Sequence, residues 1–542
     1  MFKRKYSKEE KRESESFMSG VLVLSISTVI VKIIGLAYKI PMISYLGAEG
    51  MGYFNSAYEI YAMLCVISTA GLPVALSMLV SACRERGDWL RIQHLKRSAM
   101  ALFCLMGVVG SASMILFSNR IADGIGNPDA ALCMVAIAPA LLCVCISSAF
   151  RGYFQGFNQM APTAVSQLIE ALGKLVFGIL LAIWALSRGW ELPAVSAAAI
   201  MGISLGTLIS TLYLACVHSL DQHKRARFLQ KTAEPNKKGA SLALLVRIAI
   251  PITLSSAVLS VTRLFDMALI MKRLQFQGMS ALEANRIYGT YTTMAVPIFS
   301  LIPALITPVS LALVPQLSAA IEGKSVQNQQ SVIERSMKLT TMFSIPAGIG
   351  ISVYAKNAIL LLFPTEKAAA EVAAPLLAML GPSIFFSGMI TTTNAMLQSF
   401  RRETMTIVSM VIGACVKVVS AYILIGNPAI GAMGAPISTF LCNGIIMVLN
   451  LFYLRKCFSG GRIPIGLGKV FYKPLLGASL AVFASIPVYI GILRVTERES
   501  IAFLMAVGVS VILYLLLVLL LKVVTKEDLS LLPRSEFIKK QR

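Results

Sequence analysis

The chain has 542 residues, of which 56% are hydrophobic and only 14% are charged, and its formal net charge is +23. Soluble domains carry roughly 25% charged residues, and the apolar excess here is spread along the whole chain, so it cannot be one buried core. The basic residues lie between apolar runs and form no soluble basic domain, which argues against nucleic-acid binding.

Apolar runs of about 20 residues recur from residue 18 to residue 524, and each is long enough to cross a bilayer. In lipid every backbone amide must be satisfied within its own segment, so these runs are predicted to be helices. The sequence therefore predicts an all-α polytopic membrane protein with about 14 transmembrane helices. In chain order the predicted spans are 20–44, 53–82, 95–117, 129–150, 162–186, 193–217, 246–271, 287–318, 334–353, 371–399, 404–425, 430–454, 471–493 and 501–523.

Positive charge is concentrated in alternate connections. Lys and Arg are dense in 218–245 and at the C-terminus, and sparse in the loops 119–128 and 426–431. By the positive-inside rule both termini are predicted to be cytoplasmic, with the basic loops facing anionic membrane lipids. The first apolar run is long and lacks a small-residue cleavage site, so it is predicted to be a membrane helix and not a removable signal peptide.

The two halves of the chain resemble each other. The segment 155–157 matches 398–400 at an offset of 243 residues, and the same register places Lys174 on Lys417. Nearer the start of each half, Lys32 falls on Arg263 at an offset of 231. The consistent order of these matches predicts an internal duplication.

Each repeat is predicted to contain six helices, and an even number inserts both repeats the same way up. Such a parallel repeat builds two lobes around a central cavity. The predicted domains are an N-terminal lobe at 1–217, a basic cytoplasmic connector at 218–245, a C-terminal lobe at 246–454, and two further helices with a cytoplasmic tail at 455–542.

Eight ionisable residues lie inside the predicted spans, away from the ends of those spans. The cations are Lys32, Lys39, Lys174, Arg263 and Lys417, and the acids are Glu59, Glu170 and Asp266. Each would cost about 2.5–3.5 kcal/mol at a helix centre facing lipid, so they are expected to face a wet cavity or one another. Five cations against three acids leave a field that attracts phosphate or pyrophosphate.

The individual charges have competing interpretations. Lys32 could form a buried ion pair with Glu59 or bind an anion, and its match with Arg263 favours the anion site. Glu170 and Lys174 are spaced i,i+4 in the favourable order, as a neutral pair would be, although Glu170 could also couple transport to an ion. Arg263 could pair with Asp266 at i,i+3 in the same way. Glu59, with tyrosines nearby, is also a candidate proton or cation site.

Other signals are structural or negative. Pro73, Pro297, Pro303 and Pro308 are hinge candidates, because proline removes a helical hydrogen bond. Gly-x-Ser-x-Gly at 202–206 lies in an apolar run and is typical of close helix packing. No CxxC pair or nucleotide motif occurs, so no metal or cofactor is predicted and an ion gradient or the membrane potential must supply energy. The three histidines, His94, His218 and His223, are expected at solvated surfaces.

Several local motifs carry a family resemblance. They are KIIGLA at 32–37, YLGAEGMG at 45–52, GLPVA at 71–75, RGYFQG at 151–156 and PTAVSQ at 162–167. The chain resembles the multidrug/oligosaccharidyl-lipid/polysaccharide exporter superfamily, and within it the polysaccharide-transporter branch that includes the lipid II flippases.

The resemblance implies alternating access by two lobes around a cationic cavity, with the lipid tail in a groove formed by helices 13 and 14. It also implies that Lys32 is an essential basic residue of the first helix and that Arg263 is the basic residue of the seventh. A second basic residue is expected six positions after Lys32. Tyr38 stands there instead, with Lys39 next to it.

These observations predict a monomeric flippase of the bacterial cytoplasmic membrane. Its predicted substrate is an undecaprenyl-pyrophosphate-linked cell-wall or polysaccharide precursor, moved from the inner to the outer leaflet in growth or in sporulation. One alternative is a cation-coupled multidrug exporter of the same superfamily. Another is a membrane glycosyltransferase or ligase, which would need a larger outer loop than 272–286, the longest one predicted.

Overall fold

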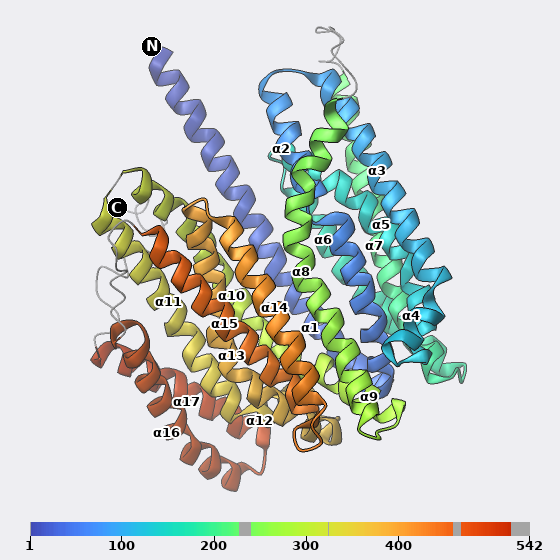
Figure 1. Ribbon diagram of the computed structural model, residues 1–542, viewed down its shortest axis with the longest axis vertical. Helices are drawn as coiled ribbons and strands as arrows, with labels where there is room; N and C mark the ends of the chain where they lie inside the picture. The colour runs from blue at the N-terminus through green and yellow to red at the C-terminus, as the bar shows by residue number, and fades with distance from the viewer. Residues whose placement is uncertain (1, 227–239, 324, 459–467, 522–542) are drawn as a thin grey trace. The chain divides into compact units, whose positions relative to one another are not determined.

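The computed structural model describes residues 2–226, 240–323, 325–458 and 468–521 (Figure 1). Within these ranges every regular element is a helix, as the sequence predicts. The chain divides into two compact units, residues 1–293 and residues 294–542, and each is described by itself.

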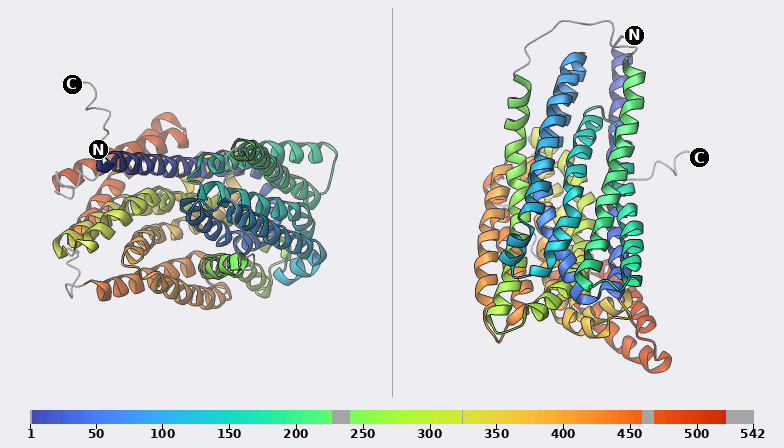
Figure 2. Two further views of the ribbon diagram at one scale, coloured as in Figure 1. Left: turned by 90° about the horizontal axis from the view of Figure 1, so that it is seen from above. Right: turned by 90° about the vertical axis from the view of Figure 1, so that its right-hand side faces the viewer.

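Among its described residues, the first unit contains nine α-helices. They are α1 (Phe2–Thr69), α2 (Leu72–Glu85), α3 (Trp89–Leu116), α4 (Ser118–Ile125), α5 (Ala131–Gly156), α6 (Ala161–Ser187), α7 (Leu192–Ala226), α8 (Ala240–Phe276) and α9 (Ala281–Thr290). In the right-hand view of Figure 2 the long helices of this unit, blue to green, run side by side with nearly parallel axes. Helix α1 packs against α5, α6, α8 and α9. It is therefore the common neighbour of α6 and α8, which carry Lys174 and Arg263.

In the part of the second unit that the structure describes there are eight α-helices. They are α10 (Val296–Glu322), α11 (Val326–Val353), α12 (Ala355–Leu362), α13 (Lys367–Ser399), α14 (Glu403–Ile425), α15 (Gly434–Cys457), α16 (Lys473–Thr496) and α17 (Glu499–Leu520). The final pair packs on the bend between α11 and α12, where Tyr354, Val482 and Phe503 are buried together. The Tyr354 hydroxyl and the Ser485 hydroxyl are 2.7 Å apart across this contact.

The number of membrane spans differs from the prediction. Among the described residues, twelve helical segments are long and apolar enough to cross a membrane, or thirteen if α11 and α12, bent by 85°, form one span. The predicted number of 14 is therefore not confirmed. Residues Ser27–Glu85 count once, whereas the sequence predicts two spans there, because the helix resumes directly after a break at Gly47 (φ 64°, ψ −178°). Glycine adopts a positive φ without the penalty of a side chain.

Helices α6 and α7 approach each other through glycines. A Cβ atom added to Gly202 would lie 2.5 Å from the Cα of Gly178, a distance that no side chain tolerates. This contact agrees with the interpretation of the 202–206 motif as a packing face and not a catalytic turn. It draws α6 against the rest of the first unit and fixes the position of the charges that α6 carries.

The division into compact units does not coincide with the predicted lobes. Residues 246–293 belong to the first unit, because α8 packs on α1 and α2, and α9 packs on α1. The contact boundary follows packing, whereas the lobe boundary at 246 follows the sequence repeat. The lobes and the connector therefore stay predictions, and most of the connector lies outside the described residues.

Candidate functional site

Three of the five predicted cavity cations meet in the first unit. Lys39 lies on α1, Lys174 on α6 and Arg263 on α8, and both α6 and α8 pack against α1. Lys174 and Glu59 are the charged groups that act on Lys39. We call Lys39, Glu59, Lys174 and Arg263 the cation cluster.

Each cation in the cluster has a different partner. The Lys39 ammonium donates a hydrogen bond to the backbone carbonyl of Thr292, with Nζ and O 2.7 Å apart. The Arg263 Nε lies 3.9 Å from the Glu59 Oε2, and an Arg263 Nη2 donates to the Ser260 hydroxyl at 3.1 Å. The Arg263 side chain is 52% exposed and that of Glu59 21%. This long and open ion pair leaves the guanidinium able to take a further acceptor.

Lys174 lies against aromatic rings. Its Nζ is 4.9 Å from the ring centroid of Tyr38 and 4.9 Å from that of Tyr58. Both distances fall within the range of a cation–π interaction. A Cβ atom at Gly178, one turn after Lys174, would lie 2.8 Å from the Tyr38 hydroxyl oxygen, so glycine at this position makes room for the ring.

The other predicted residues lie at separate positions along these and other helices. Lys32 lies on α1 about two turns before Lys39, and its side chain is exposed. The alternative of a Lys32–Glu59 pair gains no support, since the ion pair of Glu59 is with Arg263. Asp266 lies one turn after Arg263 on α8, and Lys417 lies on α14 in the second unit.

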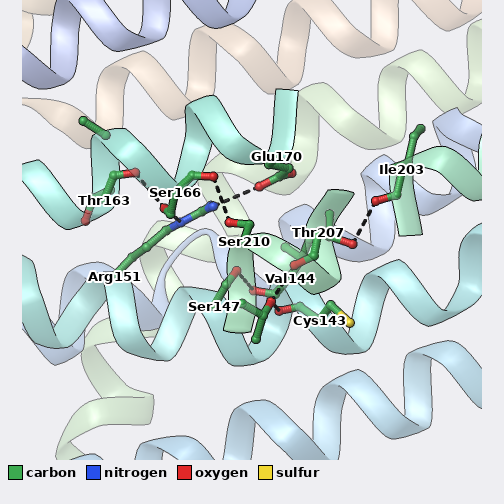
Figure 3. Close-up of polar contacts among 12 residues, drawn as sticks. Cys143, Val144, Ser147, Arg151, Thr163, Ser166, Glu170, Ile203, Thr207 and Ser210 are labelled. Atoms are coloured by element: carbon green, nitrogen blue, oxygen red, sulfur yellow. Dashed lines mark hydrogen bonds and ion pairs between the residues drawn. The ribbon is translucent and has the colours of Figure 1, made fainter. Parts of the chain in front are cut away.

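Glu170 has a partner that the sequence did not suggest. An Nη2 of Arg151 on α5 lies 2.9 Å from the Glu170 Oε2, and the Arg151 Nε donates to the Ser166 hydroxyl at 3.0 Å (Figure 3). The Ser210 hydroxyl of α7 donates to the Ser166 carbonyl at 2.8 Å, so three helices are tied together. Arg151 is therefore the direct ion-pair partner of Glu170, while Lys174 lies one turn further along α6 and also interacts with the Glu170 charge. The signal for this tie was the RGYFQG motif, which begins with Arg151.

His218 corrects an expectation about the histidines. The sequence predicts a solvated position, but the side chain is only 5% exposed and lies 4.8 Å from the ring of Tyr153 and 5.3 Å from that of Phe150. The prediction was wrong because α7 continues past residue 218 and packs on the aromatic end of α5. His94 is exposed as expected, and the side chain of His223 lies outside the described residues.

The proline hinges stay predictions. Pro73 stands in the first turn of α2 and Pro297 in the first turn of α10, where proline is favoured because it needs no helical hydrogen bond. Pro303 and Pro308 lie within α10. A π-helical turn, Tyr291–Ala295, precedes α10, and such turns are a known cause of helix bending.

The second unit contains an apolar cavity of about 400 Å³ between α11 and the α16–α17 pair. Its lining includes Met342, Phe343, Tyr354, Phe503, Val511 and Tyr514. Among the described residues, no group of three or more His, Cys, Asp or Glu side chains is placed to hold a metal ion. The lining of the cavity is largely apolar.

The described residues contain twelve or thirteen helical segments that are long and apolar enough to cross a membrane, and a few charged residues lie within them. These features define a polytopic membrane protein. The family described as polysaccharide biosynthesis protein matches residues 17–321, and the MatE family matches residues 251–423. The chain belongs to the polysaccharide biosynthesis protein family.

Two relatives from Bacillus subtilis (strain 168) cover most of the chain. Stage V sporulation protein B is 26% identical over 443 residues, which are 81% of this chain and 83% of that protein. Lipid II flippase MurJ is 25% identical over 469 residues, 82% of each chain.

Two solved structures share the fold. The inward closed conformation of the lipid II flippase MurJ matches with a TM-score of 0.70 at 14% identity, covering 92% of this chain and 98% of that one. An inward-facing multidrug resistance MATE family transporter of the MOP superfamily matches with a TM-score of 0.63 at 15% identity, covering 81% and 98%. Both likenesses show the fold.

Proposed function

We propose that this protein is a flippase for an undecaprenyl-pyrophosphate-linked cell-wall or polysaccharide precursor. It would move the precursor from the inner to the outer leaflet of the bacterial cytoplasmic membrane, with both termini in the cytoplasm. The observation that carries the proposal is the cation cluster on α1, α6 and α8. The names of two relatives, a lipid II flippase and a sporulation protein, support it.

The charge balance of the cluster favours an anionic ligand. The cluster contains three cations and one acid, Glu59, and the neighbouring Glu170 shares its charge between Lys174 and its ion pair with Arg151. An uncompensated charge at membrane depth is costly, and a bound diphosphate would offset the excess. Arg263, with an open guanidinium, is the residue best placed to bind phosphate oxygens, because its planar fork can make two hydrogen bonds at once.

The apolar cavity supports the lipid part of the proposal. Its volume of about 400 Å³ would hold a part of an isoprenoid chain, and its lining would remove that hydrocarbon from contact with polar groups. Alternating access of the two predicted lobes, a monomeric state, and coupling to an ion gradient or to the membrane potential complete the proposal.

The test is translocation by purified protein in vesicles that contain a labelled lipid-linked pyrophosphate precursor. We expect Arg263→Ala and Lys32→Ala to abolish transfer between leaflets. Arg286→Ala is the matched control for Arg263→Ala, because Arg286 also pairs with a glutamate, Glu49, but lies outside the cluster. In cells, depletion should accumulate the precursor in the inner leaflet. Wild-type transfer by Arg263→Ala would overturn the anion site in the cation cluster, and wild-type transfer by Lys32→Ala would overturn the role that the family resemblance gives to Lys32.

A multidrug exporter is the second candidate. The MatE family match over residues 251–423 favours it, and so do the tyrosine rings around Lys174, which are of the kind that bind organic cations. Export of a cationic dye by wild-type vesicles, with no transfer of the lipid-linked precursor, would select this candidate.

A further inference from the structure

The aromatic rings of Tyr38 and Tyr58, both on α1, lie on either side of the Lys174 ammonium. The rings of Tyr38 and Phe54 are 6.0 Å apart, and those of Phe54 and Tyr58 are 6.5 Å apart and inclined by 16°. Tyr38 is 1% exposed. The rings are therefore held by their own packing, and Lys174 of α6 enters between two faces that α1 supplies.

Aromatic faces with a nearby carboxylate are the chemistry by which proteins recognise organic cations such as quaternary ammonium groups. Tyr38 and Tyr58 supply the faces, and Glu170, one turn before Lys174 on α6, supplies the carboxylate. In this protein the cation over both rings is a side chain of the protein itself. The neighbouring Lys39 is engaged elsewhere, since its ammonium donates to the Thr292 carbonyl.

We propose that Lys174 is the built-in occupant of a cation cage formed by Tyr38 and Tyr58, and that it excludes organic cations from the cavity. Lys174 is then a specificity-determining residue, which keeps the site for anionic headgroups. This inference deepens the proposed function and rests on it for its biological meaning. The cage itself can be tested by cation binding alone.

The experiment measures binding of radiolabelled tetramethylammonium to the purified full chain in detergent. Lys174→Ala empties the cage, and we expect it to bind the cation at least about tenfold more tightly than wild type does. Lys174→Arg keeps a cation in place and Lys174→Met fills the space without a charge, so neither should gain binding. Adding Tyr58→Leu to Lys174→Ala should remove the gain.

A matched control comes from the sequence repeat. Lys417 is related to Lys174 by the offset of 243. Tyr38 falls on Leu269 at the offset of 231 that relates Lys32 to Arg263, and Tyr58 falls on Thr293 at the offset of 235 that relates Pro73 to Pro308. Lys417→Ala should therefore gain no tetramethylammonium binding. An equal gain in Lys417→Ala and Lys174→Ala would contradict a cage made by the tyrosines.

The remaining outcomes also decide. If folded Lys174→Ala binds no better than wild type, the cage does not exist. If Lys174→Ala is unstable, tetramethylammonium should raise its unfolding temperature while leaving wild type unchanged, and failure of this rescue would overturn the proposal. If Lys174→Ala binds the cation and the wild-type protein moves no lipid-linked precursor, the cage is supported and the proposed flippase is refuted.

Discussion

The two halves of the sequence repeat have different residues at two matched positions. At the offset of 243 residues, Arg151 falls on Asn394, and Glu170 falls on Gly413. In the first unit the arginine ties α5 to α6 through an ion pair of 2.9 Å. In the second unit the Asn394 Oδ1 accepts a hydrogen bond of 2.7 Å from the Nδ2 of Asn450, which ties α13 to α15.

The surroundings explain why the charge is missing from the second unit. A Cβ atom at Gly413 would lie 2.3 Å from the Cγ1 of Ile446, so a glutamate there would displace a core side chain. Asn450 is fully buried, and a neutral amide costs far less to bury than a charge. Both halves therefore contain a polar contact between helices. In the first half it is an ion pair, Arg151–Glu170, in the same unit as the cation cluster. In the second half it is a neutral hydrogen bond, Asn450–Asn394.

Arg151→Met tests the charged tie and should have the largest effect on stability. The Arg151 side chain is 14% exposed and that of Glu170 is 29% exposed, so methionine would leave a partly buried carboxylate without its partner. We expect a loss of about 2–3 kcal/mol in the free energy of unfolding, measured by denaturation in detergent. Glu170→Gln in the Arg151→Met background should recover part of the loss. A double variant that loses as much as the two single variants together would show that the pair is not coupled.

Asn450→Ala tests the neutral tie and should have a smaller effect. The amide donates to the Asn394 Oδ1 at 2.7 Å and to the Thr393 hydroxyl at 3.1 Å, so alanine leaves buried acceptors without a donor. The expected loss is about 1–2 kcal/mol. Asn427→Ala is the control and should change little, because Asn427 lies in the exposed segment after α14 and its Oδ1 accepts one exposed hydrogen bond from the Ala429 amide. A loss as large as that of Arg151→Met would mean that charge is not what distinguishes the halves.

The class of fold followed from the sequence because membrane burial leaves few choices. Long apolar runs must become helices, and charges at membrane depth are rare enough to mark a site. Lys39, Lys174 and Arg263 were selected by that rule before any contact was known. The break at Gly47 was not predictable, because one glycine in an apolar run does not reveal whether the helix resumes directly.

The partners of the charges could not be predicted, because spacing rules describe only one helix at a time. The i,i+4 rule suggested Lys174 for Glu170, whereas Arg151 comes from a different helix. The same limit hid the contact of Lys174 with Tyr38, which is 136 residues away in the chain. His218 was misjudged for a related reason, since its burial depends on the packing of α7 against α5.

Arg286→Met sharpens the comparison further and should have the smallest effect. Its Nη2 lies 2.9 Å from the Glu49 Oε2, the same distance as between Arg151 and Glu170. The Arg286 side chain, however, is 57% exposed, and water and salt screen the pair. We expect a loss below about 1 kcal/mol that shrinks further when the salt concentration is raised, whereas the loss in Arg151→Met should respond little to salt. Equal losses and equal salt dependence in the two variants would mean that burial does not decide the strength of these ion pairs. The lower cost of burying a neutral amide would then no longer explain why the second unit has Asn450 and Asn394 in place of an ion pair.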